Sequence, residues 1–350
     1  MKPRLLVGLL LILGVALATW LYLKRGRGRE LIVVSYGGGA YQASHKRAFI
    51  EPYQAQTGIR VQSVVWGAEF GKLQEMVRSG AVPWDVVEVT ASQFLRGSRE
   101  GLFAQMTTLP DAEEFKPLPG GPTISPLGVP NVYWSTVVAF DPHAFPQVGP
   151  STWQDFWDLT RFPGPRALYD NPRGNLEFAL LADGVSPANL YPLDVTRAFR
   201  KLDELKPHVR VWWSDGTEPV QLLLSHQVVS SSAWSGRIVA LGEREKEIRY
   251  SWKGAAHELD YWIVPRGSKS IDSASAFIRF ASRPEEMAAQ ARLIGYGPAN
   301  SQALNYVDAK ILPHLPTAPA NWALSFVINA TWWAEHEQEV EAFWVRWKGQ

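Results

Sequence analysis

Short apolar runs alternate with helix-like stretches along most of the chain, and this alternation restricts the fold more than any other feature of the sequence. Apolar runs rich in β-branched and aromatic residues are typical of strands. In the first third of the chain they cover residues 31–36, 59–66 and 84–90. Helical patterns over 44–56 and 69–79 lie between them and stop next to a glycine, a common helix terminator. The pattern predicts an α/β fold, with mixed sheets and flanking helices.

The same alternation continues to the C-terminus. A long apolar run over 132–140 predicts a strand that can cross between two lobes, and 250–268 predicts two strands. The tail over 330–347 predicts a helix with aromatic residues on one face.

With 350 residues the chain is long enough to bury two cores. We expect lobe I to comprise residues 31–135 and 262–318, and lobe II to comprise 141–258. A C-terminal segment, 319–350, packs back on the lobes. Two or three crossing segments then form a hinge, and a ligand cleft lies between the lobes.

The N-terminus indicates export. Lys2 and Arg4 precede a run without charge from Leu5 to Leu23. Residues 1–30 are either a signal peptide, with Ala16-Leu17-Ala18 as a cleavage motif, or a retained membrane anchor. Both alternatives put the rest of the chain outside the cytoplasm, and a periplasmic location fits best.

Composition excludes several classes of function. The chain has 35 Lys+Arg against 34 Asp+Glu, and so lacks the basic excess of a nucleic-acid-binding protein. It has no cysteine, which removes thiol catalysis, disulfides and a lipoprotein anchor. The seven histidines show no HxxxH or HExxH spacing, and no serine lies in a G-x-S-x-G elbow. We therefore expect no catalytic residues, no metal site and no cofactor.

Three glycines between two tyrosines form the first candidate site. Tyr36 ends a predicted strand, Gly37–Gly39 follow, and Tyr41 opens the helical stretch. The stretch lacks the second half of GxGxxG and the Lys-Ser/Thr of a P-loop. A tight structural turn remains possible, but we favour a turn that lines the cleft and places both rings against a small ligand.

Three further stretches carry polar groups at strand ends. Asn171 and Arg173 lie on the loop "YDNPRGNLE", where the fork of the arginine suits a carboxylate. Trp234 and Arg237 lie in "SSSAWSGR". Asp260 lies inside an apolar strand, and a buried carboxylate needs a cation or hydrogen-bond donors. We expect that cation to be a ligand ammonium, with a protein arginine as the alternative.

The order of these stretches resembles the periplasmic solute-binding proteins of polyamine-type ABC transporters, in particular the branch for putrescine, spermidine or γ-aminobutyrate. The resemblance spans about residues 31–345. It rests on "YGGGAYQASHKRAFIEPYQAQTGIRV", "WDVVEV", "NVYWSTVVAFD", "SAWSGRI", "LDYWIVPRGS", "GYGPAN" and "WWAEHEQEV".

This resemblance implies a two-lobed periplasmic binding protein fold of type II. It also implies a monomer that delivers a small solute to a membrane permease. It adds Tyr296 of "GYGPAN" and Trp332 or Trp333 to the expected ligand-binding residues, with Trp333 preferred.

The charges predict the class of ligand. The loop at 170–174 reads "DNPRG" instead of offering paired carboxylates, and Arg237 follows the W-S-G turn. Two arginines near one end of a pocket and Asp260 at the other suit a zwitterion, so we favour an ω-amino acid such as γ-aminobutyrate over spermidine. A secreted or membrane-tethered hydrolase and a ligand sensor remain the rival functions.

Overall fold

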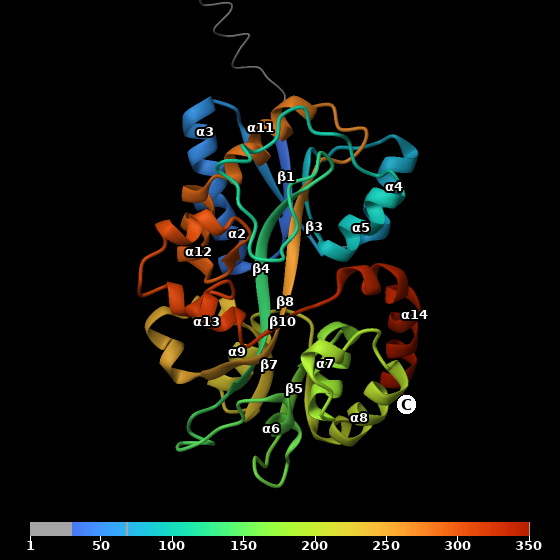
Figure 1. The fold of residues 1–350 in the computed structure, drawn as a ribbon, viewed down its shortest axis with the longest axis vertical. Helices are drawn as coiled ribbons and strands as arrows, with labels where there is room; N and C mark the ends of the chain where they lie inside the picture. Colours follow the sequence, from blue (N-terminus) through green and yellow to red (C-terminus); the bar gives the residue numbers. More distant parts are fainter. Residues whose placement is uncertain (1–29, 68, 350) are drawn as a thin grey trace, which may run out of the picture.

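The computed structural model describes residues 30–67 and 69–349. A mixed sheet of ten strands runs through the molecule, in the order β2-β1-β3-β8-β4-β7-β5-β6, with two short strands paired at its side. Figure 1 shows the elements gathered in an upper and a lower lobe, which the long strands β4 (Val129–Phe140) and β8 (Arg249–Ile263) join. The α/β class with mixed strands and flanking helices is as predicted.

The upper lobe holds the N-terminal strands and two helices from later in the chain (Figure 1). β1 pairs in parallel with β2 and β3, and β3 pairs antiparallel with β8. Its strands and helices are β1 (Leu31–Tyr36), α2 (Gly39–His45), α3 (Glu51–Thr57), β2 (Val61–Trp66), α4 (Phe70–Ser79), β3 (Val86–Thr90), α5 (Ala91–Arg99), α11 (Ile271–Ala281) and α12 (Pro284–Ile294).

The lower lobe is built mainly from the middle of the chain. β7 pairs antiparallel with β4 and parallel with β5, which pairs with β6. Its strands and helices are α6 (Trp153–Trp157), β5 (Arg166–Tyr169), α7 (Pro172–Ala182), α8 (Val195–Leu205), β6 (Val209–Trp213), α9 (Glu218–Leu224), β7 (Ser230–Trp234) and α10 (Ser235–Val239). The exact lobe boundaries that the sequence predicts stay a prediction.

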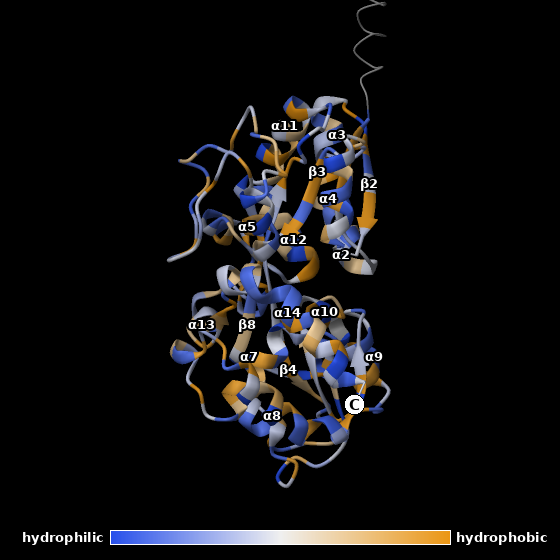
Figure 2. Cartoon of the chain, turned by 90° about the vertical axis from the view of Figure 1, so that its right-hand side faces the viewer, coloured by the Kyte–Doolittle hydropathy of each residue, from blue (hydrophilic) through white to orange (hydrophobic). Residues whose placement is uncertain are grey.

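The C-terminal part returns along the molecule through the short elements β9 (Gly297–Pro298), α13 (Pro319–Trp322) and β10 (Phe326–Val327). The last helix, α14 (Ala330–Lys348), carries aromatics on its buried side. Trp332, Trp333, Trp344 and Trp347 join the hydrophobic core of α6, α7 and α8. A second large core fills the upper lobe around β1, β3 and the end of β8. Figure 2 shows hydrophobic residues on β2 and β3 of the upper lobe and on parts of the helices in both lobes.

Two local predictions were wrong. Residues 250–268 do not form two strands, because β8 continues through Gly254, which takes a φ of 72° inside the strand. The register against β4 shifts there, so extra residues of β8 bulge out without ending the strand. The first helix begins at Gly39, not at Ser44, and continues to Thr57 through a π-helical stretch, Lys46–Ile50.

The segment predicted as a leader or anchor lies outside the described residues, apart from Glu30. Among the helices of the described residues, none has the length and apolar character needed to cross a membrane.

Candidate functional site

A cavity of about 580 Å³ opens between the two lobes, a size typical of small-molecule sites. Both lobes and both crossing strands line it. The upper lobe contributes Tyr36, Gly37, Gly38, Tyr41, Val65, Trp66, Gly67, Glu69, Lys72, Thr90 and Tyr296; the lower lobe contributes Tyr169, Ser214, Asp215, Gly216, Trp234 and Arg237; β4 contributes Trp134, and β8 contributes Asp260.

Six of the nine ligand-binding residues expected from the sequence line this cavity, while three lie elsewhere. The six come from six separate elements or turns: Tyr36, Tyr41, Trp234, Arg237, Asp260 and Tyr296. The other three, Asn171, Arg173 and Trp333, make contacts within the protein that are described below.

The glycine turn between β1 and α2 forms part of the cavity wall. Gly38 has a φ of 97° and Gly39 a φ of 53°, a region that side chains with a Cβ rarely adopt. The chain can therefore reverse within three residues and leave Tyr36 and Tyr41 both facing the cavity. The carbonyl of Gly38 accepts a hydrogen bond of 3.2 Å from Nη1 of Arg237, so this turn also contacts the lower lobe.

Aromatic rings form walls on both sides of the cavity. In the upper lobe, Tyr36 stacks on Trp66 with ring centroids 6.2 Å apart. In the lower lobe, Trp234 meets Tyr169 and Trp134 edge-on, each at 5.5 Å. The faces of such rings can hold an organic cation, and each contact is worth about 1–2 kcal/mol when desolvated.

Asp260 is almost fully buried at the cavity. Its backbone pairs with Thr90, two residues along the antiparallel β3–β8 ladder from the pair that joins Glu88 to Trp262. Asp260 and Glu88 thus lie on the same face of the sheet. Burial, followed by the nearby charge of Glu88, raises the pKa of Asp260 well above its ordinary value.

Glu88 lies behind the cavity wall. It accepts hydrogen bonds from the hydroxyl of Tyr41 at 2.6 Å and from the amide of Asn131 at 2.7 Å. Burial nevertheless raises the pKa of Glu88 to about 7. Its nearest basic group, His45, has its own pKa lowered to about 3 by burial, and so stays neutral. His45 therefore does not neutralise Glu88, and the charge of Arg173 only partly offsets the raised pKa of Asp260.

Arg237 is a cation of the lower lobe that reaches the cavity. It is 9% exposed, and its guanidinium lies 5.9 Å from the ring centroid of Tyr41. Asp215 also lines the cavity, and its pKa is lowered first by hydrogen bonds from Thr217 and further by the charge of Arg237. The site thus presents both signs of charge.

Five cavity-lining side chains carry buried polar atoms with no hydrogen-bond partner among the described residues. They are four donors and one acceptor: Oη of Tyr36, Nε1 of Trp66, Nε1 of Trp234, Nε of Arg237 and Oδ1 of Asp260. Buried polar groups in folded proteins are rarely left unsatisfied. Their convergence on one cavity indicates a ligand with a cationic donor and an acceptor group.

Arg173 lies at the junction of the lobes but outside the cavity lining. Its guanidinium pairs with Glu258 of β8 at 3.3 Å and with Glu337 of α14. It also donates to the hydroxyl of Ser92, on α5 of the upper lobe, at 2.9 Å. Arg173 therefore links the lower lobe to the upper lobe through groups of the protein.

Asn171 and Trp333 likewise contact protein groups. The side chain of Asn171 accepts a hydrogen bond of 2.9 Å from the amide of Arg173 and caps α7. Trp333 is fully buried and donates to Glu177 at 2.8 Å. Both residues shape the loop and helix that hold Arg173.

Sequence reasoning missed several lining residues. Trp134 lies in β4, which is buried along nearly its whole length, so no alternation of polar and apolar residues marked it. Trp66 and Tyr169 end β2 and β5, and Asp215 follows β6, the position at which ligand-binding residues often occur in α/β folds. That positional signal could have identified them.

The chain is similar to known proteins along most of its length. The family model described as "Bacterial extracellular solute-binding protein" matches residues 48–317. A γ-aminobutyric acid-binding protein of Pseudomonas aeruginosa is 36% identical over 328 residues, which cover 92% of each chain. The spermidine/putrescine-binding periplasmic protein of Escherichia coli is 23% identical over 185 residues, 52% of each chain.

The fold also has a solved counterpart. The crystal structure of an ABC transporter substrate-binding protein from Bradyrhizobium japonicum superposes with a TM-score of 0.84 at 32% identity. The match covers 91% of this chain and 99% of that one.

Proposed function

Because the chain belongs to the family of bacterial extracellular solute-binding proteins, we propose that its cavity binds an ω-amino acid of the γ-aminobutyrate type. Proteins of this family carry a small molecule to the permease of an ABC transporter. The choice of ligand rests on one observation. Oδ1 of Asp260, an acidic acceptor, and Nε of Arg237, a basic donor, are both buried without a partner among the described residues, and both residues line the same cavity.

In this proposal the ligand ammonium pairs with Asp260, and the ligand carboxylate pairs with Arg237. Oδ1 of Asp260 and Nε of Arg237 are both buried and unpartnered within the described residues, which supports the assignment. Tyr36 and Trp234 stand beside them with free donors that can complete the carboxylate's hydrogen bonds. The methylene chain of the ligand then lies between the aromatic walls.

Ligand binding favours the closed arrangement because only that arrangement brings groups of both lobes onto one ligand. Arg237 belongs to α10 of the lower lobe, while its hydrogen-bond acceptor Gly38 belongs to the upper lobe. A carboxylate held by Arg237 next to this contact adds to the attraction between the lobes. The permease would recognise the closed surface.

The finer aspects of the function are also proposals. We infer that the chain performs no chemistry on its ligand and works as a monomer in the periplasm, after removal of residues 1–30 or tethered by them. The comparisons give the hydrolase and sensor alternatives no support.

A diamine such as putrescine is the second candidate. Asp215 supplies a second carboxylate in the cavity, and Glu69 supplies another. A diamine needs an acid at each end, so this observation favours it, whereas the charge of Arg237 opposes it.

Isothermal titration calorimetry on the purified chain tests the proposal, with γ-aminobutyrate, putrescine and spermidine as ligands. We expect γ-aminobutyrate to bind most tightly, and Asp260→Asn to weaken it by about 3 kcal/mol, roughly 100-fold, because a buried ammonium loses its counter-ion. Asparagine has nearly the same shape and removes a desolvated acid, so the variant should fold normally.

Asp215→Asn is the matched control, because it also removes a cavity carboxylate. It should leave the affinity for γ-aminobutyrate within about threefold. If putrescine binds more tightly than γ-aminobutyrate and both substitutions weaken it equally, the diamine replaces the amino acid as the ligand. If Asp260→Asn binds every amine as well as the parent does, the proposed site is wrong.

A further inference from the structure

A cluster of one carboxylate and two imidazoles lies in the lower lobe, apart from the cavity. Asp141 follows the end of β4, His143 comes two residues later, and His226 lies on the turn between α9 and β7. Nδ1 of His143 is 3.1 Å from Oδ1 of Asp141, and Nδ1 of His226 is 2.6 Å from Oδ2. One ligand atom from each of the three residues lies within 4.8 Å of the others.

The scaffold holds the carboxylate in place. Asp141 is 3% exposed, and its backbone amide donates to the carbonyl of Val229 at 3.0 Å, which continues the β4–β7 pairing. The backbone amide of His143 donates to Oδ1 of Asp141 at 2.8 Å. The two imidazole rings meet edge-on, with centroids 5.2 Å apart.

The backbone of His226 supports the same geometry. Its φ of 55° lies in the left-handed region, and among the described residues it is the one residue other than glycine with positive φ. This conformation keeps the imidazole beside Asp141 instead of letting the turn relax. The two rings remain largely exposed to solvent, so an ion from solution can reach them.

We propose that Asp141, His143 and His226 form a binding site for one divalent transition-metal ion, with Zn²⁺ as the ion that suits it best. Two imidazole nitrogens and one carboxylate oxygen are a common donor set for zinc, and water can take the fourth position. With metal–ligand bonds of about 2.0–2.1 Å, a tetrahedral centre places its ligand atoms about 3.3 Å apart. The contacts of the two imidazoles, 3.1 Å and 2.6 Å, are to different oxygens of Asp141, and one ligand atom from each residue lies within 4.8 Å of the others, so a shift of the two exposed rings can bring the donor atoms to this spacing.

The alternative is a network of hydrogen bonds alone. Each neutral imidazole can carry its proton on Nδ1 and donate it to one oxygen of Asp141. A metal ion instead binds the lone pair of each Nδ1, while each imidazole carries its proton on Nε2, and it links the end of β4 to the turn before β7. The two alternatives therefore differ in whether the three residues hold a metal, and not in whether they contact one another.

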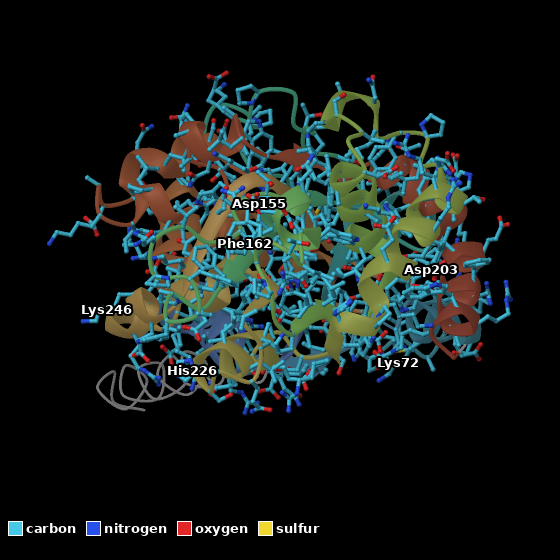
Figure 3. All side chains as sticks on the ribbon, turned by 90° about the horizontal axis from the view of Figure 1, so that it is seen from below. Lys72, Asp155, Phe162, Asp203, His226 and Lys246 are labelled. Carbon is cyan, nitrogen blue, oxygen red and sulfur yellow. The ribbon has the colours of Figure 1, made fainter. Side chains whose placement is uncertain are left out.

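The proposed metal site is separate from the solute site. None of its three residues is among those that line the cavity. Figure 3 labels His226 together with the cavity residue Lys72 and shows them well apart on the molecule. Metal binding at the cluster should thus stabilise the lower lobe without entering the solute site.

A zinc titration of the untagged, chelator-treated protein tests the site, with a competing chromophoric chelator to measure affinity. We expect one Zn²⁺ per chain and at least a tenfold weaker affinity in each of His143→Gln and His226→Gln. Zn²⁺ should raise the thermal midpoint of the parent and not that of either variant. Mg²⁺, which prefers oxygen ligands, should compete poorly.

His208→Gln is the matched control, because His208 is also exposed in the lower lobe and lies outside the cluster. It should bind Zn²⁺ as the parent does. X-ray absorption of the loaded protein should show nitrogen and oxygen ligands at about 2.0 Å with two imidazoles. Zinc affinity that is unchanged in both His143→Gln and His226→Gln, or no saturable zinc site in the parent, would overturn the proposal.

Discussion

Two arginines leave the lower lobe and contact the upper lobe, but they meet different surroundings. Arg237 reaches the glycine turn at Gly38 and lines the cavity, with its Nε unpartnered within the described residues. Arg173 reaches Ser92, but its guanidinium is surrounded by Glu258 and Glu337. Arg237 therefore keeps a hydrogen-bond donor available for a ligand. The guanidinium of Arg173 is instead paired with carboxylates of the protein.

The comparison shows that the residue type alone does not decide which arginine binds a ligand. Both arginines lie where a strand gives way to a helix, and both are polar groups at the edge of a cleft. The supply of acidic partners distinguishes them. We therefore expect Arg173 to affect stability and lobe closure, and Arg237 to affect ligand choice.

The largest effect should come from Arg173→Ala. This change leaves Glu258 and Glu337 without their shared cation, and we expect the free energy of unfolding to fall by about 3 kcal/mol. Denaturant unfolding measures the loss. Arg161→Ala is the control, since its ion pair with Asp155 is on the surface and worth at most about 1 kcal/mol. Equal losses for the two variants would contradict the role given to Arg173.

The next largest effect should be that of Arg237→Gln on ligand selection. Loss of the charged hydrogen bonds to a ligand carboxylate should weaken γ-aminobutyrate by about 2 kcal/mol, or roughly 30-fold. The affinity for putrescine should stay the same or rise, because a repelling charge has gone. Calorimetry with both ligands measures the difference, and a parallel loss for both would place Arg237 outside direct contact with the carboxylate.

A smaller effect should appear in the pH dependence of binding. An ammonium pairs best with ionised carboxyls, but burial raises the pKa values of both Asp260 and Glu88. Ligand binding should therefore release a proton, and the affinity for γ-aminobutyrate should rise by about tenfold between pH 5.5 and 8. Glu88→Gln removes the neighbouring carboxyl whose charge raises the pKa of Asp260. The increase of affinity with pH should therefore be smaller in this variant.

Stability should respond to pH in the opposite direction. Glu88 has a folded-state pKa of about 7 against an ordinary value of 4.5. The protonated group thus contributes stability that is complete below pH 4.5 and is lost as the pH rises through 7. Unfolding free energies of the parent and Glu88→Gln, measured across this range, should lie closest together below pH 4.5 and diverge as the pH rises through 7, because glutamine stays neutral while Glu88 must ionise. Parallel curves would contradict it.

The smallest effect should come from Tyr36→Phe, which removes only a buried hydroxyl that has no partner among the described residues. If that hydroxyl donates to the ligand, affinity should fall by about 1 kcal/mol, near fivefold, while the thermal midpoint stays constant. An unchanged affinity would restrict the role of Tyr36 to its ring.

Local patterns in the sequence predicted much of the fold. The strand at 31–36 and the helix ends next to Gly58 and Gly80 agree with the structure, because glycine in a left-handed conformation closes both helices. Gly254 also has positive φ, but it lies inside β8 at a register shift. Sequence alone does not distinguish these two uses of glycine, since the difference depends on which strand pairs alongside.

The same limit applies to the site. Tyr36 and Tyr41 could be identified because the turn that places them is local. The partners of Arg173 could not, because Glu258 and Glu337 are 85 and 164 residues away along the chain. Asp260 was predicted from its isolation in an apolar strand, but its proximity to Glu88 depends on the antiparallel β3–β8 pairing.

The continuity of β8 has a mechanical consequence. This one strand pairs with β4 in the lower lobe, carries Glu258 and Asp260 past the junction, and pairs with β3 in the upper lobe. The lobes therefore cannot move apart by a change in flexible loops alone. The hydrogen-bonded pair of strands β4 and β8 has to bend. The bulge at Gly254, whose amide is held by the carbonyl of Leu324, is where that ribbon is least regular. Its stiffness should limit how far, and how fast, the entrance opens between one cargo and the next.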